Sequence, residues 1–484
     1  MLFNSYLFIF IFLPISLLLW FFLNNMGKYK TAQVFLVAMS IWFYAYFNYS
    51  YIWIILASCI FNFGCSLLME KFEKKKKWIG ILGIIGNLSI LFYYKYFDFF
   101  IENINFLFKK DFPLFHILLP LGISFFTFQQ LSYIIDRMKG EAPHYHLIDY
   151  LSFVTFFPQL IAGPIVLHTE LIPQFQDRDK RKFNADNFTD GCVQAILGLG
   201  KKVLIADTLG LVVNGAYVNR YYFTTWSTII FILAYAFELY FDFSGYCDIA
   251  MGVGRMFNFS LPANFDSPYR SHSMKEFWNR WHKTLSRFFI SYVYIPLGGG
   301  RKGRKRKMIN TMIVFLLSGL WHGASWNYVA WGFLNGIGVI ISSRRKEPSK
   351  HRFLSWLATF SYFLFTLIFF RSESMEDVGI ILRGLVNPIG VKFIYDMAQF
   401  MDIPELYIFQ KIFDLFLPQY QGYVCLAAFM ILLIICTLLL RGKNPEQLVK
   451  EGKYTTKTAI VLSIIFIWSV VSLSGVSTFL YFNF

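Results

Sequence analysis

Long apolar runs, separated by short polar segments, dominate the chain. Residues 6–23, 51–69 and 459–482 are clear examples, and further helices are expected near 78–97, 114–135 and 148–165. A helix of about twenty apolar residues crosses a hydrocarbon core of roughly 30 Å, and about ten to thirteen stretches of this kind recur along the sequence. The pattern therefore predicts an all-α, polytopic integral membrane protein.

The pattern changes in the middle of the chain. From about residue 165 to 310 the apolar runs are short and are interrupted by Gly, Pro and polar residues, as in "DFSGYCD" (242–248), which favours a turn. Irregular backbone at membrane depth persists only where protein or a water-filled cavity covers it. We therefore expect broken or re-entrant helices and a cavity here.

One membrane domain accounts for the whole sequence, residues 1–484. We expect N-terminal helices over 1–110, a functional core over 111–345 and C-terminal helices over 346–484. Within the last part, 377–385 and 407–417 have the pattern of amphipathic helices that lie in the membrane interface.

Composition and charge narrow the class of protein. Hydrophobic residues make up 56% and charged residues 15%, against about 25% charged in soluble domains. The net charge of +16 is concentrated in "KFEKKKK" (71–77), "RKGRKRK" (301–307) and "RRKEPSKHR" (344–352). Loops of this kind face the cytoplasm. No nucleic-acid-binding fold accompanies the charge, so we expect no nucleic acid partner.

Six cysteines lie mostly inside apolar runs and lack the paired spacing of metal ligands. We expect small buried hydrophobes and no metal site. The motifs HExxH, GxSxG and HRD are absent from the sequence, so metalloprotease, hydrolase and kinase chemistry have no support.

His322 is the most unusual residue of the apolar stretches, in "LSGLWHGASWNYVAWGFLNG" (317–336). A helix that starts at Lys307 would carry it roughly 22 Å into the membrane at about 1.5 Å per residue. Ser318, His322 and Ser325 would share a face, and the Gly319–Gly323 pair would allow close helix packing. An ionisable residue there favours a functional site. The alternative is a structural imidazole bonded to a neighbouring carbonyl.

His282 lies in "MKEFWNRWHKTLSRFF" (274–289), which predicts one amphipathic helix. Glu276 and Arg280 are four residues apart and can pair. Asn279, His282 and Ser286 would share another face. The alternative is an interfacial helix whose histidine has no function.

Charged residues near these stretches offer further candidates. The loop "YIPLGGGRKGRKRK" (294–307) could hold the phosphates of a donor through Arg301, Lys302 and Arg304, or serve only as a cytoplasmic basic loop. Asp242 and Asp248 lie in an apolar stretch and must be paired or line a cavity. They could orient a histidine, or pair with Arg255 or Arg270.

Four stretches together resemble the membrane-bound O-acyltransferase family, in particular its bacterial branch of alginate and peptidoglycan O-acetylation and teichoic acid D-alanylation. They are "FPQLIAGPI" (157–165), "ELYFDFSGYCDIAMGVGRMFNFSLPANFDSPYRS" (238–271), "EFWNRWHKTLSRFFISYVYIPLGGGRKG" (276–303) and the stretch around His322. The chain length and the ending "FLYFNF" (479–484) are more similar to the polysaccharide O-acetylation members.

The resemblance implies a ring of helices around a central tunnel, with His322 as the catalytic residue and His282 as the second histidine of the family. It also implies that an acyl group comes from a cytoplasmic thioester, acetyl-CoA, with no bound cofactor. The acyl group would cross a bacterial cytoplasmic (inner) membrane to an extracytoplasmic acetyltransferase of the Ser-His-Asp type, which modifies a polysaccharide.

Acyl transfer from a thioester to a hydroxyl needs a base of near-neutral pKa, which histidine provides. A developing oxyanion would need donors, for which Trp321, Trp326, Asn327 and His282 are candidates. Ser318 and Ser325 would support His322. Three alternatives remain: D-alanyl transfer to teichoic acid, a polysaccharide exporter, and a scaffold that only recruits an acetyltransferase.

Overall fold

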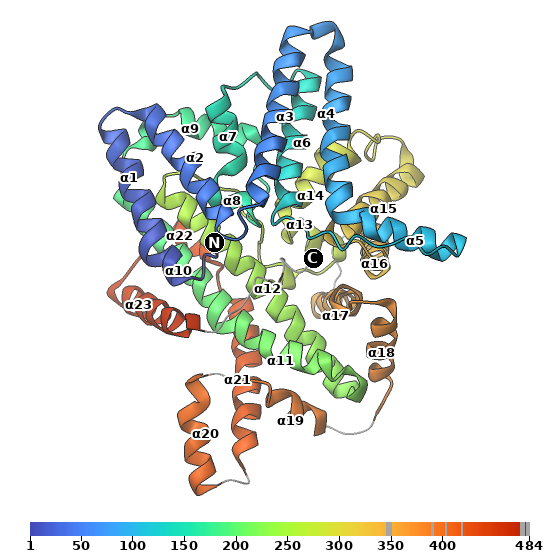
Figure 1. Ribbon diagram of the computed structural model, residues 1–484. Helices are drawn as coiled ribbons and strands as arrows, with labels where there is room; N and C mark the ends of the chain where they lie inside the picture. Colours follow the sequence, from blue (N-terminus) through green and yellow to red (C-terminus); the bar gives the residue numbers. More distant parts are fainter. Residues whose placement is uncertain (345–350, 389–391, 402–403, 418–419, 475–479, 481–484) are drawn as a thin grey trace. The chain divides into compact units, whose positions relative to one another are not determined.

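The computed structural model describes residues 1–344, 351–388, 392–401, 404–417, 420–474 and 480. These residues are helical or irregular, with no β-strand in the described ranges. Most of "FLYFNF" and of "RRKEPSKHR" falls outside them. The chain divides into two compact units, each built from segments that are distant in sequence (Figure 1). Unit 1 comprises residues 1–195, 246–264 and 284–297, and unit 2 comprises 196–245, 265–283 and 298–484.

Unit 1 is built mainly from the first nine α-helices. They are α1 (Leu13–Asn25), α2 (Tyr29–Ala45), α3 (Tyr51–Lys71), α4 (Lys76–Leu91), α5 (Phe97–Phe108), α6 (Ile123–Lys139), α7 (Leu147–Thr155), α8 (Phe157–Leu160) and α9 (His168–Gln176). The basic segment 71–77 forms the tight connection of the α3–α4 hairpin (Figure 1). This hairpin packs on α6, where Cys65, Met69 and Ile134 form a buried cluster.

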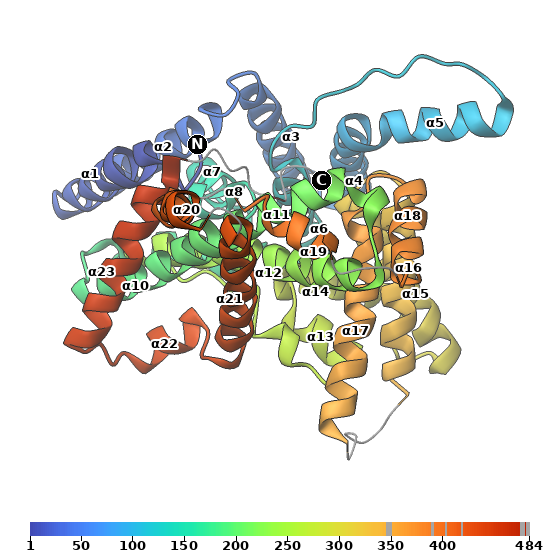
Figure 2. The ribbon, with the colours of Figure 1, turned by 90° about the horizontal axis from the view of Figure 1, so that it is seen from below.

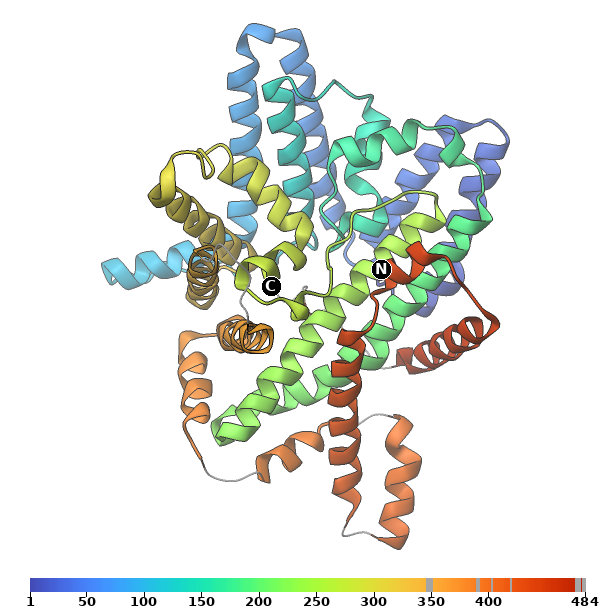
Figure 3. The ribbon, with the colours of Figure 1, turned by 180° about the vertical axis from the view of Figure 1, so that it is seen from behind.

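Three helices contribute residues to both units: α10 (Ala185–Gly200), α12 (Thr225–Met256) and α14 (Lys283–Phe289). Unit 2 also contains α11 (Asp207–Val218), α13 (Met274–Arg280), α15 (Gly303–His322), α16 (Trp326–Ser342), α17 (Arg352–Arg371), α18 (Met375–Leu385), α19 (Lys392–Ala398), α20 (Pro404–Phe416), α21 (Gln421–Arg441), α22 (Pro445–Glu451) and α23 (Thr456–Val471). In Figure 2, α15, α16 and α17 lie side by side. Figure 3 shows α20 alongside α21.

Shorter helical turns connect or extend these elements. Within the described ranges the π-helical segments are η1 (Phe8–Phe12), η3 (Phe92–Tyr96), η5 (Lys201–Ala206) and η8 (Ile290–Tyr294). The 3₁₀ turns include η2 (Glu73–Lys75), η4 (Asp179–Arg181), η6 (Arg220–Tyr222), η7 (Pro268–Arg270) and η10 (Ser472–Ser474). η1 continues directly into α1, and η3 joins α4 to α5.

Six helical stretches of the described residues are long and apolar enough to cross a membrane: Phe8–Asn25, Tyr51–Lys71, Glu73–Phe108, Thr225–Met256, Arg352–Arg371 and Gly422–Arg441. The all-helical membrane class is thus confirmed. Further predicted spans correspond to helices that are slightly shorter, such as α2 and α16 with 17 residues each. The amphipathic helices predicted over 377–385 and 407–417 are present as α18 and α20.

Several predicted boundaries are wrong, and proline explains two of them. Residues 111–120 are irregular, although a helix is predicted from 114, and Pro113 and Pro120 lie in this stretch. The helix predicted over 148–165 ends at Thr155, because Pro158 fits only the first turn of the next helix, α8.

The turn predicted at 242–248 is also wrong, because α12 is one continuous helix of 32 residues. A Cβ on Gly245 would lie 2.8 Å from the carbonyl oxygen of Gly198. Gly245 therefore lets α12 pack closely on α10, and it does not interrupt the helix. The expected irregular segment begins later, after Met256, and extends to Ser273 apart from the single turn η7.

Candidate active site

His322 is the last residue of α15, and the structure confirms the predicted helix through this stretch. The imidazole is 3% exposed. Three aromatic rings surround it in edge-on geometry, with centroid distances of 4.8 Å to Trp321, 5.1 Å to Trp331 and 5.2 Å to Phe370. Trp331 comes from α16 and Phe370 from α17. The end of α15 thus presents His322 to an aromatic pocket formed by the two helices that follow it in sequence.

The glycines beside His322 explain how α15 and α16 approach each other. A Cβ on Gly319 would lie 2.3 Å from the carbonyl oxygen of Tyr328, and a Cβ on Gly332 would lie 2.4 Å from that of Phe315. Close packing at Gly319 is confirmed, but its partner glycine is Gly332 on α16. Gly323 instead follows the helix in extended conformation.

His282 lies at a break that the sequence pattern does not predict. The expected helix over 274–289 ends at Arg280, Trp281 is extended, and His282 has a φ of +44° before α14 begins. The predicted shared face of Asn279, His282 and Ser286 is therefore wrong, and Asn279 is exposed. The Glu276–Arg280 ion pair is confirmed, with a nitrogen–oxygen distance of 3.1 Å.

Trp321 connects the two histidines. Its ring centroid lies 5.9 Å from that of His282 and 4.8 Å from that of His322. Phe243 of α12 covers His282 from another side at 4.8 Å. Burial lowers the pKa of His282 to about 3, so its imidazole is neutral at physiological pH. Unit 2 thus brings both predicted histidines to one aromatic cluster, defined here by Phe243, His282, Trp321, His322, Trp331 and Phe370.

The predicted supporting residues separate into different environments. Ser318 is buried one turn before His322. Ser325 lies beyond the end of α15. The prediction that it shares a helix face with His322 is therefore wrong. Its hydroxyl donates to Asn327, whose amide nitrogen donates to the carbonyls of Phe369 (3.2 Å) and Ser372 (2.5 Å). Asn327 therefore connects the start of α16 to the end of α17 by hydrogen bonds, and Ser325 donates to the oxygen of the same amide. Trp326 is 57% exposed.

Trp331 and Asn335 lie in α16 near His322 and are not among the residues predicted from the sequence. The Nε1–H of Trp331 is buried and donates to no acceptor in the described part of the chain. Asn335, one turn further along α16, accepts a hydrogen bond from Trp278 Nε1 (3.3 Å) and donates to the Trp331 carbonyl (2.9 Å). A buried amide four residues from a tryptophan, in an otherwise apolar helix, is the signal that could have identified the pair.

Asp242 pairs with a buried lysine of unit 2. Asp242 Oδ1 lies 2.6 Å from Lys202 Nζ, which also contacts Asp207 at 2.6 Å. The predicted pairing of Asp242 with Arg255 or Arg270 is therefore wrong, and Arg255 pairs with Asp190 at 3.1 Å. Asp248 is buried in unit 1. Asp242 and Asp207 thus balance the charge of the buried Lys202.

The glycine-rich basic loop has a defined local structure. Gly298 and Gly299 have φ values of +100° and +57°, and Asn310 of α15 donates to the Gly299 carbonyl at 2.9 Å. Arg301, Lys302 and Arg304 are exposed beside it. Three cations are thus held at the beginning of the helix that ends in His322.

The positive φ of His282 allows a test that distinguishes the effect of backbone strain on stability from the role of the imidazole. Both His282→Ala and His282→Gly remove the imidazole and should impair any function of that ring alike. An L-residue with a side chain costs about 1–2 kcal/mol in the left-handed region, whereas glycine does not. We therefore expect the glycine variant to unfold at the higher temperature in a detergent melting assay. A less stable glycine variant would show that backbone strain at His282 is unimportant.

The comparisons with known proteins agree with this architecture. The model of the MBOAT, membrane-bound O-acyltransferase family, matches residues 39–375. A peptidoglycan O-acetyltransferase of Helicobacter pylori is 36% identical and is aligned over 100% of this chain and 98% of its own length. A probable alginate O-acetylase of Pseudomonas aeruginosa is 37% identical, over 78% of this chain and 73% of its own.

A teichoic acid D-alanyltransferase of Streptococcus thermophilus is 30% identical, over 48% of this chain and 60% of its own length. The matched region of the family model includes both predicted histidines and most of the helices around them. The chain is a multi-pass membrane enzyme, an O-acyltransferase, and it belongs to the membrane-bound O-acyltransferase family.

Proposed function

We propose that this enzyme takes an acetyl group from a cytoplasmic thioester, acetyl-CoA, and passes it across the cytoplasmic membrane for O-acetylation of peptidoglycan. The observation that carries the choice of polymer is the match to a peptidoglycan O-acetyltransferase along the whole chain. The similarity to the alginate relative covers about four fifths of the chain, and that to the D-alanyl relative about half.

In this proposal His322 is the general base. As the oxygen of the acceptor hydroxyl attacks the thioester carbonyl, its proton moves to the imidazole. The carbon–sulfur bond then breaks, and the proton passes to the departing thiolate. The imidazole is buried among aromatic rings, and its ring nitrogen is the group that would accept that proton.

Trp331 is the donor that best suits the developing oxyanion. It borders His322, and its Nε1–H donates to no acceptor among the described residues. The two amide donors of Asn327 already serve backbone carbonyls, and Trp326 is exposed. Asn335 is a positioning residue, since it bonds the backbone of Trp331.

Replacing Trp331 by phenylalanine tests this role. The ring remains and the N–H is lost, so kcat should fall by roughly 10²–10³, the usual effect of removing one oxyanion donor, while KM changes little. Trp326→Phe is the matched control and should keep normal kcat. A Trp331→Phe enzyme with unchanged kcat would remove Trp331 from the mechanism.

The basic loop would hold the donor on the cytoplasmic side, where Arg301, Lys302 and Arg304 meet the phosphates of CoA. On the outer side, an acetyltransferase of the Ser-His-Asp type would receive the acyl group and modify the polymer. A tunnel between the two sides, as the resemblance implies, would bring donor and acceptor to His322.

Mass spectrometry of envelope polymers tests the function. A strain without its own enzyme would receive this gene, and its muropeptides would be compared with those of the empty-vector strain. Gene-dependent O-acetyl groups on muropeptides are expected. Acetyl groups on an exported polysaccharide would overturn the choice of polymer, and D-alanyl esters on teichoic acid would overturn the choice of acyl group.

A further inference from the structure

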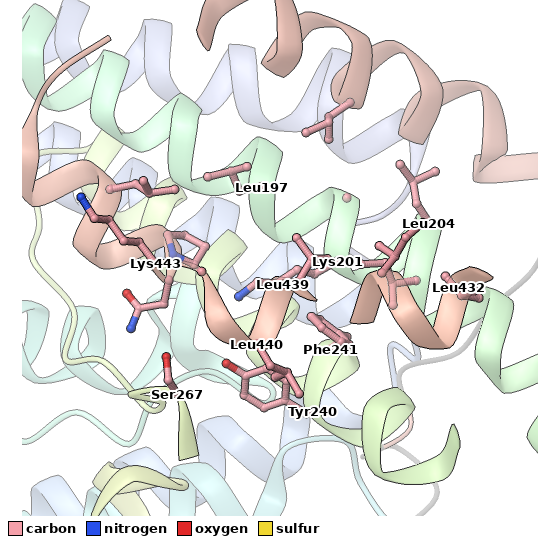
Figure 4. A pocket seen from close by; sticks show the side chains of 18 of the residues that line it. Leu197, Lys201, Leu204, Tyr240, Phe241, Ser267, Leu432, Leu439, Leu440 and Lys443 are labelled. Atoms are coloured by element: carbon pink, nitrogen blue, oxygen red, sulfur yellow. The ribbon is translucent and has the colours of Figure 1, made fainter. Parts of the chain in front are cut away.

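Unit 2 contains a second site, a cavity of about 340 Å³ around the C-terminal part of α21. Its walls come from the end of α10, η5, α12, α21, α22 and α23 (Figure 4). The volume falls at the lower end of the range of about 300–1,000 Å³ that is usual for small-molecule sites. None of the residues of the aromatic cluster around the two histidines lines it.

The cavity lies where a membrane helix ends. α21 is strongly apolar over Gly422–Arg441, and few of these residues are buried inside the protein. Most of its surface therefore contacts lipid. The cavity begins at Leu432 on this helix and continues past its end to Leu448 on α22. It thus extends from the hydrocarbon region into the headgroup region.

The charge of the segment that follows α21 indicates on which side of the membrane the cavity opens. Residues 441–457, "RGKNPEQLVKEGKYTTK", contain five basic residues and two acidic ones. Such an excess beside a membrane helix marks the cytoplasmic side, whose leaflet carries anionic lipids. The mouth of the cavity is therefore at the level of the cytoplasmic headgroups.

The lining is mostly apolar and includes two lysines. Leu204 and Leu439 form part of the apolar wall, and Lys201 and Lys443 also line the cavity (Figure 4). Asn444 adds an amide side chain to the lining. Lys443 pairs with Glu451 at 2.6 Å in an exposed position. The segment 441–457 nevertheless keeps an excess of basic over acidic residues around the cavity.

The cavity is accessible from the lipid side. Ile435, Leu439 and Trp468 line it and are still 42%, 49% and 48% exposed. In a bilayer, apolar surface of this kind contacts acyl chains, and a cavity of apolar walls would be filled by one. A soluble nucleotide would find too few polar groups along these walls.

We propose that this cavity binds an anionic phospholipid of the cytoplasmic leaflet, with one acyl chain along α21 and the phosphate beside Lys201 and Lys443. The lipid would connect α21 and α22 to η5 and α23. The site is separate from the acyl-transfer chemistry, and the proposal does not depend on the identity of the acceptor polymer.

Lipid retention by the purified full-length protein tests the proposal. Phosphatidylglycerol and phosphatidylcholine with identical acyl chains would be added in detergent, and bound lipid would be counted by mass spectrometry. We expect preferential retention of phosphatidylglycerol and a higher unfolding temperature with it than with phosphatidylcholine. Equal retention of the two lipids would overturn the proposal.

Two pairs of variants locate the lipid. Leu439→Trp fills the cavity and should reduce retention of phosphatidylglycerol severalfold, whereas Leu438→Trp, next to it on α21 and outside the lining, should not. Replacing Lys201 and Lys443 by glutamine should weaken phosphatidylglycerol retention about fivefold per lysine, and Lys453→Gln, outside the cavity, should not. Equal effects within either pair would place the lipid elsewhere.

Discussion

Replacing His322 by alanine is expected to abolish acyl transfer while the protein remains folded in the membrane. General-base catalysis contributes about 10²–10⁴ in rate, and an alanine side chain cannot accept the proton. Release of CoA from acetyl-CoA by the purified enzyme, in the presence of an acceptor, measures the effect. His322→Gln should behave in the same way, because it keeps a polar side chain but cannot serve as a base.

His351→Ala is the matched control, since this histidine is exposed at the start of α17. It should retain normal turnover. Rapid turnover by the His322 variants would exclude His322 as the base and would favour a structural role for the imidazole at the α15–α16 contact.

Replacing Gly332 by alanine should have the second large effect, on the stability of unit 2. The new Cβ would meet the Phe315 carbonyl oxygen at 2.4 Å, and backbone cannot move away as a flexible side chain can. Overpacking of this kind typically costs about 1–3 kcal/mol. It would also displace α15 near His322, so both the unfolding temperature and the turnover should fall.

Gly379→Ala is the control for this prediction. Gly379 lies inside α18, and a Cβ there would meet no atom within 4 Å. Alanine is the better helix former by up to about 1 kcal/mol, so this variant should be at least as stable as the wild type. If Gly332→Ala were equally stable, the close approach of α15 and α16 at the two glycines would be incorrect.

The sequence alone predicts the helical membrane class, because runs of apolar residues leave little choice of structure in a bilayer. It also predicts that Gly319 serves close packing, but not that its partner is Gly332, since the helix pair is decided by tertiary contacts. Gly245 shows the same limit: between two aspartates it suggests a turn, yet it lies inside a continuous helix. The sequence alone does not distinguish a glycine that ends a helix from a glycine that allows two helices to pack closely.

The break at His282 could not be predicted for a related reason. The stretch 274–289 has a regular helical pattern, and the positive φ depends on the rings that bury the imidazole, Phe243 and Trp321. His322 could be singled out from sequence because it is an ionisable residue in an apolar stretch, whereas His282 lies in an amphipathic stretch and is named through the resemblance to the family. Trp331 is harder to single out: among the twelve tryptophans its distinguishing sequence signal is the amide of Asn335, four residues later in the same apolar helix.

The most direct test of the central claim compares the envelope polymers of strains that carry wild-type enzyme, the His322→Gln variant or no enzyme, with equal amounts of both proteins in the membrane. We predict O-acetylated muropeptides with the wild type, and the level of the empty strain with the variant. Wild-type acetylation in the strain with His322→Gln would contradict the assignment of acyl transfer to His322.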